Sequence, residues 1–129
     1  AEKRLQGIWE FEKYFENGED KSNMLLQDTA YKGFYFFKDK SLNKNYIRLY
    51  GKGNHRTSEV GNYRLEKEVL IFDFFVDSIN HKQYGYDFLY PFFTALDTTI
   101  EMKILRLTNK ELKIESNLNG KKQITTLKK

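Results

Sequence analysis

Strict alternation of apolar and polar side chains is the feature that most constrains the fold of this chain. Trp9 and Phe11 alternate with Glu10 and Glu12, and several later segments repeat the pattern with a period of two residues. A period of two places successive side chains on opposite faces of a β-strand, whereas an amphipathic helix needs a period of about 3.6. The pattern therefore predicts a chain built almost entirely of β-strands.

Nine segments carry this strand pattern, and turn sequences separate most of them. Asn17-Gly18 and Asn119-Gly120 are typical of two-residue hairpin turns. Pro91 should end the strand that precedes it, because proline has no N–H to donate to a neighbouring strand. The predicted strands are residues 7–17, 31–38, 46–50, 59–65, 69–76, 83–90, 98–107, 111–116 and 122–128.

Chain length and connection length together predict the architecture. The chain has 129 residues, a common size for one domain, so residues 1–129 are predicted to form a single domain. Helix is predicted only at residues 20–29, as one short segment. Connections of a few residues favour an up-and-down order of antiparallel strands, and a sheet in that order removes its edges by closing. The prediction is an all-β, antiparallel up-and-down β-barrel of about eight or nine strands.

Several kinds of chemistry have no candidate residues. The chain has no cysteine, which excludes a disulfide scaffold, a thiolate zinc site and a cysteine nucleophile. Its two histidines, His55 and His81, lie far apart in polar segments that are typical of exposed loops. No nucleophile elbow or phosphate-binding glycine loop is present. We therefore expect no enzymatic activity, no cofactor and no bound metal.

A group of basic residues lies close to aromatic residues in the sequence, as a platform for single-stranded nucleic acid requires. Such platforms combine cations with aromatic rings on which bases stack. Here the net charge is only +4, and anions are interleaved with the cations, so we expect no nucleic-acid partner. The basic residues concerned are Lys38, Lys40, Lys44, Arg48, Lys52 and Arg56.

The aromatic content points towards binding. Twenty-one residues are aromatic, and three predicted strands carry aromatic residues on both faces, which is more than one closed core requires. The surplus is consistent with a ligand cavity, a sticky outer face or a protein interface. If the barrel is open, alternation places its ligand-binding wall at Phe11, Phe36, Tyr63, Phe72, Phe74 and Met102. The segment from Tyr84 to Tyr90 is then either another wall or an outer binding surface.

Three sequence motifs resemble those of lipocalin-like (calycin) domains. Gly7-Ile8-Trp9 resembles the Gly-x-Trp motif near the start of their first strand. Residues 61–70 and 104–114 resemble the middle and late hairpins of the small lipocalin-like domains found in exported Bacteroidetes proteins. Order and spacing agree over nearly the whole chain. The exception is residues 77–97, a longer aromatic segment than the resemblance leads one to expect.

The resemblance implies a barrel of about eight strands in which Trp9 packs across the closed end. It also implies export to the periplasm or cell surface, often as a lipid-anchored protein after removal of its signal, and binding without catalysis. We therefore expect a binding protein of the cell envelope that holds a small hydrophobic or amphipathic ligand inside its barrel. The alternative is a structural or protein-interaction module with a filled barrel and a binding outer face. Membrane contact is expected only through such a lipid anchor.

Overall fold

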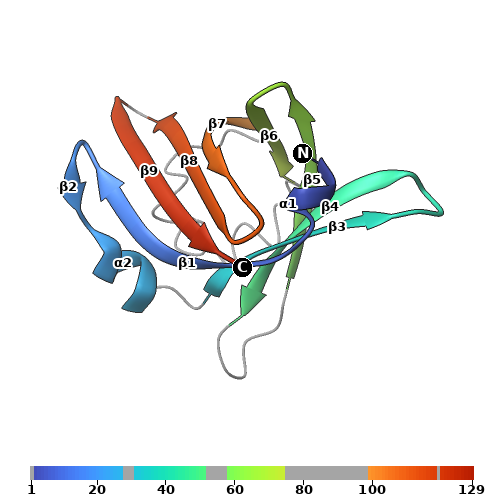
Figure 1. Cartoon of the computed structure of the whole chain (residues 1–129), viewed down its shortest axis with the longest axis horizontal. Helices are drawn as coiled ribbons and strands as arrows, with labels where there is room; N and C mark the ends of the chain where they lie inside the picture. The colour runs from blue at the N-terminus through green and yellow to red at the C-terminus, as the bar shows by residue number, and fades with distance from the viewer. Residues whose placement is uncertain (1, 28–30, 52–57, 75–98, 119) are drawn as a thin grey trace.

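The computed structural model is one antiparallel sheet that curls round until its two ends meet (Figure 1). It describes residues 2–27, 31–51, 58–74, 99–118 and 120–129. In these residues nine strands lie in the order β2-β1-β3-β4-β5-β6-β7-β8-β9, and β1 also pairs with β9. The elements are α1 (Glu2–Leu5), β1 (Gly7–Glu16), β2 (Glu19–Asp20), α2 (Ser22–Gln27), β3 (Tyr31–Asp39), β4 (Lys44–Gly51), β5 (Ser58–Glu66), β6 (Val69–Phe74), β7 (Thr99–Leu107), β8 (Glu111–Leu118) and β9 (Lys121–Lys128).

The predicted antiparallel barrel is confirmed. Pairing of β1 with β9 closes eight strands into a barrel, and β2 is one additional short strand beside β1. The short helix predicted within residues 20–29 is α2, whereas α1 and the two-residue β2 were not predicted. The predicted strand 83–90 lies outside the described residues. Neither described helix is long and apolar enough to cross a membrane.

Residues with left-handed backbone conformations form the tightest turns. Asn17 has φ 50° and Gly18 has φ 81°, the signs that a two-residue hairpin turn of type I′ requires at both central positions. Lys67, in the turn between β5 and β6, also has a positive φ, of 57°. Each of these turns joins strands that lie side by side, and from β3 to β9 the sheet follows the order of the sequence.

Alternation fills the barrel interior with large apolar side chains. Trp9 is fully buried, as expected, and its indole N–H donates a hydrogen bond to the carbonyl oxygen of Leu5 in α1 at 2.7 Å. The amine of Lys129 lies over the Trp9 ring, 5.2 Å from its centre. We call this the Trp9 end of the barrel. The core consists of Leu5, Trp9, Phe11, Tyr14, Phe34, Phe36, Ile47, Tyr63, Leu70, Phe72, Ile100, Met102, Leu112, Ile114 and Leu127.

Because successive strands run in opposite directions, the connections between them lie at two opposite ends of the barrel. The turns from β3 to β4, β5 to β6 and β7 to β8 lie at the Trp9 end, together with α1. The last residues of β1 and β8 and the first residues of β9 lie at the opposite end, which we call the Tyr14 end. β7 also begins at the Tyr14 end, and the barrel wall opens beside its first residues.

Candidate functional site

Most of the residues predicted to form a ligand-binding wall lie on the inner face of the barrel. Five of the six are buried in one core cluster, with exposed fractions of 6% or less, and come from β1, β3, β5, β6 and β7. These five are Phe11, Phe36, Tyr63, Phe72 and Met102. The sixth, Phe74, is the last residue of β6, and its side chain lies outside the described part of the structure.

The rings on this inner face pack against one another. Phe34 lies among them, with ring centres 5.2 Å from Phe11, 5.9 Å from Phe36 and 5.6 Å from Phe72. Phe36 in turn meets Tyr63 at 5.0 Å, nearly edge to face. These spacings are those of well-packed aromatic pairs. The aromatic cluster of these five rings therefore fills the part of the interior that it occupies, and a ligand contact at these residues stays a prediction.

A chain of hydrogen bonds runs along the neighbouring strands β8, β9 and β1 at the Tyr14 end. The hydroxyl of Ser116 donates to Gln123 Oε1 at 2.9 Å, and Gln123 Nε2 donates to the Tyr14 hydroxyl at 2.9 Å. The Tyr14 hydroxyl donates to Glu16 Oε1 at 3.1 Å, and Glu16 Oε2 lies 2.9 Å from the amine of Lys21. We call these five residues the polar chain. It gives the interior a hydrogen-bonding wall beside the aromatic cluster.

The carboxyl group of Glu16 stays charged although its residue is buried. Burial alone would raise the pKa of Glu16. Hydrogen bonds from Lys21 and Tyr14, with the positive charges of Lys21 and Lys121, outweigh burial and hold the pKa below its ordinary value. The polar chain therefore contains an ionised carboxylate, which is paired with the amine of Lys21.

The sequence does not predict the polar chain. For its two residues from β1, Tyr14 and Glu16, the reason is a β-bulge. The pairing of β1 with β9 shifts register between Phe11 and Lys13, so the inner face passes from Trp9 and Phe11 to Tyr14 and Glu16. Strict alternation would have placed Lys13 inside instead. For Ser116, by contrast, alternation with Leu112 and Ile114 is regular, and all three residues are buried.

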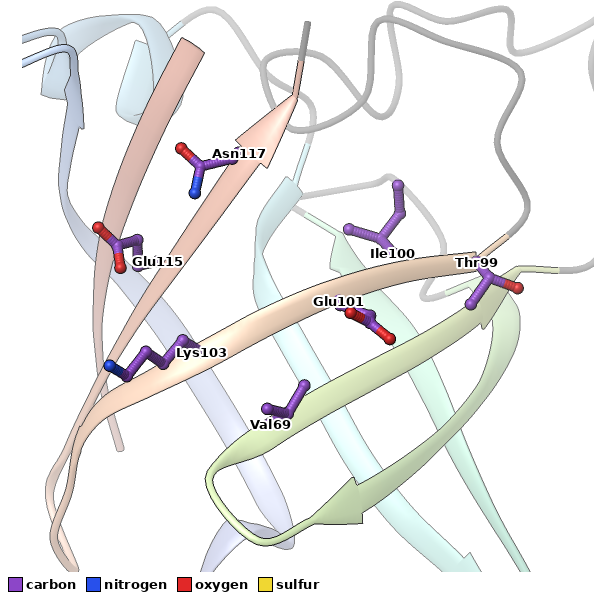
Figure 2. A pocket seen from close by; sticks show the side chains of 7 residues that line it. All are labelled: Val69, Thr99, Ile100, Glu101, Lys103, Glu115 and Asn117. Atoms are coloured by element: carbon purple, nitrogen blue, oxygen red, sulfur yellow. The ribbon is translucent and has the colours of Figure 1, made fainter. Parts of the chain in front are cut away.

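The barrel wall opens where β7 and β8 separate. These strands pair from Leu107 and Leu112 as far as Lys103 and Glu115, and their pairing ends there. Beyond this point β7 continues to Thr99 paired with β6, and β8 continues paired with β9. Figure 2 shows the two ribbons diverging from Lys103 and Glu115. We call this opening the fork.

A pocket of about 580 Å³ occupies the fork. Val69 and Ile100 give it apolar surface, and Ile100 also belongs to the buried core. The acidic side chains of Glu101 and Glu115 and the amine of Lys103 give it charge. The full lining is Val69, Thr99, Ile100, Glu101, Lys103, Glu115 and Asn117, all drawn in Figure 2.

Backbone groups of both strands point into the fork. The amide N–H of Ile104 donates to Glu68, towards β6, so alternate residues of β7, including Glu101, direct their N–H and C=O groups towards β8. By the same rule, the bond from Lys129 N–H to the carbonyl of Lys110 directs the backbone of Asn117 towards β7. Beyond Lys103 the ladder joins no described residues of β7 and β8. The pocket thus offers backbone donors and acceptors as well as side chains.

The pocket residues were not predicted as a site. Most of them alternate with core residues, and alternation assigns such positions to solvent, so the sequence carries no signal that marks them. None of the six predicted wall residues is among the lining residues. In the described part of the chain, no group of three or more histidine, cysteine, aspartate or glutamate residues could hold a metal ion. His55 and His81 lie outside the described residues.

Comparison with known proteins finds likeness in structure. No protein-family model and no curated protein matches the sequence. A lipocalin-like protein from Bacteroides uniformis superposes with a TM-score of 0.61 at 14% identity, covering 98% of each chain. An uncharacterized protein from Bacteroides eggerthii superposes with a TM-score of 0.56 at 14% identity, covering 96% of this chain and 98% of the other. The chain therefore has the lipocalin-like fold, as a closed antiparallel barrel of eight strands with one short strand added.

Proposed function

We propose that this chain is a non-catalytic binding protein of the cell envelope that takes a small amphipathic molecule at the fork. The observation that carries the proposal is the break in the ladder between β7 and β8, which leaves a pocket of about 580 Å³ in the wall. Sites for small molecules commonly measure about 300–1,000 Å³. The envelope location rests on the resemblance of the sequence to domains of exported proteins.

The pocket has the two kinds of surface that an amphipathic molecule needs. Its apolar portion would lie against Val69 and Ile100, and Ile100 connects the pocket with the buried core. Its polar portion would meet the backbone groups of Glu101 and Asn117 and the amine of Lys103. A few polar groups beside an apolar surface are what fix a small ligand in one orientation.

Titration with a fluorescent amphiphile, N-phenyl-1-naphthylamine, tests this proposal. We expect saturable binding to the unmodified protein and at least about tenfold weaker binding to Val69→Trp, because the added indole occupies the pocket. Ile8→Trp is the matched control, since Ile8 is exposed on β1, which pairs with neither β7 nor β8, and should leave affinity unchanged. Equal affinity of both variants for the probe would show that the probe does not bind at the fork.

Phe72→Ala separates binding at the fork from binding in the interior. Phe72 is fully buried in the aromatic cluster and is not a lining residue of the pocket. If the ligand lies at the fork, this variant should lose stability and keep its affinity for the probe. A large change in affinity would instead place the ligand among the predicted wall residues.

A second candidate function is a protein-interaction module with a filled barrel. The packing of the aromatic cluster favours it, because those rings leave little room where they lie. Tyr35, Phe37 and Tyr46 form a further group of aromatic side chains on the outer face of β3 and β4. Absence of saturable probe binding in the unmodified protein would favour this function over ligand binding.

A further inference from the structure

The hairpin of β3 and β4 projects beyond the barrel at the Trp9 end. β1 pairs with β3 only as far as Phe36, and β5 pairs with β4 only as far as Tyr46. Residues 37–45 therefore extend past both neighbouring strands, and Figure 1 shows the hairpin reaching away from the other elements. Its last turn can meet a flat surface without obstruction from the rest of the sheet.

The tip of this hairpin combines one exposed leucine with several cations. Leu42 has an exposed fraction of 58%, the largest among the exposed large hydrophobic residues of the described chain. Lys38, Lys40 and Lys44 surround it in sequence, and all three are exposed. Asp39 is the only acidic residue in residues 38–45, so the three lysines leave a net charge of +2 there.

Hydrogen bonds within the turn fix this arrangement. The Asp39 carboxylate accepts bonds from the backbone N–H of Ser41 at 3.0 Å, from its hydroxyl at 2.7 Å and from the N–H of Leu42 at 3.2 Å. Asn43 then turns the chain with φ 52°. The only carboxylate of the tip is thus directed back into the turn, while Leu42 stays outside.

Aromatic side chains brace the hairpin behind its tip. The rings of Phe37 and Tyr46 stack with centres 5.4 Å apart and planes 21° apart. The guanidinium of Arg48 lies 4.3 Å from the centre of the Phe37 ring. Because Tyr46 and Arg48 already pack against the ring of Phe37, the ring is poorly placed to stack on a nucleobase. A surface that binds cations and accepts one leucine fits the tip better than a nucleic acid does.

We propose that the tip formed by residues 38–45 docks on an anionic lipid surface. The three lysines would lie against anionic headgroups, and Leu42 would enter the boundary between headgroups and acyl chains. Each lysine close to an anionic bilayer strengthens binding about fivefold, so three contribute about 100-fold. This contact is independent of the pocket at the fork, which lies on other strands.

Sedimentation with lipid vesicles tests the proposal. The protein should bind vesicles of phosphatidylcholine with about a third phosphatidylglycerol, and salt should weaken that binding. The triple variant Lys38→Gln, Lys40→Gln, Lys44→Gln should bind about 100-fold more weakly. Leu42→Asp should lower binding about tenfold or more. Since the tip lies outside the core, each variant should keep the circular dichroism spectrum of the unmodified protein.

Two matched controls separate the tip from general charge and exposure. Lys13→Gln, Lys110→Gln, Lys128→Gln removes three exposed lysines elsewhere, and Leu105→Asp changes another exposed leucine. Both controls should retain most of the vesicle binding. Equal binding to vesicles of phosphatidylcholine alone, or equal losses in the tip and control variants, would overturn the proposal. So would tip-dependent binding of a single-stranded oligonucleotide by a protein that leaves anionic vesicles unbound.

Discussion

Gly33 determines how closely β3 approaches β1. A Cβ atom at this position would overlap the carbonyl oxygen of Trp9 and lie 2.9 Å from Glu10 Cα. The atoms in the way belong to the backbone, so a rotamer change cannot relieve the overlap. Glycine at this position therefore allows the backbones of β3 and β1 to lie this close together.

Gly33→Ala should therefore destabilise the fold, with a loss in the free energy of unfolding of about 1–3 kcal/mol, as overpacked sites show. Urea denaturation measures the loss. Gly18→Ala is an informative comparison, because a Cβ at Gly18 meets no atom within 4 Å and the variant suffers only from its φ of 81°. A Gly33→Ala protein as stable as the unmodified one would show that the two strands can move apart at little cost.

Trp9→Ala should cost about 3–5 kcal/mol of unfolding free energy, the range for removal of a large buried aromatic side chain. The change removes a fully buried ring and leaves the Leu5 carbonyl without its indole donor. Fluorescence offers a second measurement on the unmodified protein, since Trp9 is the only tryptophan in the chain. Its emission should be blue-shifted, and emission like that of indole in water would contradict its burial.

Glu16 should make stability depend on pH in the acidic range. Its pKa is lower in the folded protein than the ordinary value of 4.5, so folding favours the ionised form. This contribution is complete above pH 4.5 and is lost as the pH falls through the lower, folded-state pKa. Urea midpoints should thus fall less between pH 6 and pH 3 in Glu16→Gln than in the unmodified protein. Equal falls would show that Glu16 titrates alike in both states.

At the scale of elements, the fork gives adjacent residues different hydrogen-bonding environments. The Lys103 pair with Glu115 lies inside the ladder, and Met102 pairs with Leu70 on the other side of β7. The N–H of Glu101 points into the fork. One short strand therefore contains amides inside the ladder beside the amide of Glu101, which no described residue of β8 pairs with.

Amide hydrogen exchange followed by NMR should reveal this difference. We expect the Glu101 amide to exchange much faster than the amides of Met102 and Lys103, because ladder hydrogen bonds slow exchange. Asn117 should likewise exchange faster than Ser116. Slow exchange at Glu101 in the protein without ligand would mean that another group already occupies the fork, and would count against its role as an empty site.

The sequence predicts most of the strands, but it predicts neither the β-bulge nor the fork. Alternation and Asn-Gly dipeptides are local, so they predicted most described strands and the inward positions of Phe36 and Phe72. The bulge between Phe11 and Lys13 depends on how β1 meets β9, over 100 residues away, and no local pattern marks it. The fork likewise reflects where two pairings end. Its lining residues look like ordinary solvent-facing positions, so the candidate pocket could not be predicted.

At the scale of the whole molecule, one contact between the ends of the chain completes the barrel. β9 pairs with β1 on one side and with β8 on the other, along nearly its whole length. It also supplies Gln123 to the polar chain and Leu127 to the core. The last strand is therefore needed by both halves of the sheet.

Deletion of residues 121–129 should prevent stable folding, because it leaves both β1 and β8 as unpaired edges and opens the core. The truncated chain should lack a cooperative urea transition by circular dichroism. A synthetic peptide of residues 121–129, added in excess, should restore part of the transition by pairing between the two edges. A truncated chain with an unchanged transition would show that barrel closure contributes little to stability.

The fork also has a consequence for self-association. A closed barrel has no free strand edge, but beyond Lys103 and Glu115 no described strand pairs with the facing edges of β7 and β8. Such edges can pair with the strands of another molecule. Glu101, Lys103 and Glu115 place charges along this opening, and charged side chains at a strand edge discourage edge-to-edge pairing. The residues that give the pocket its polarity therefore also limit aggregation. Neutral substitutions at these positions would lower solubility, because the strand edges at the fork could then pair with another molecule.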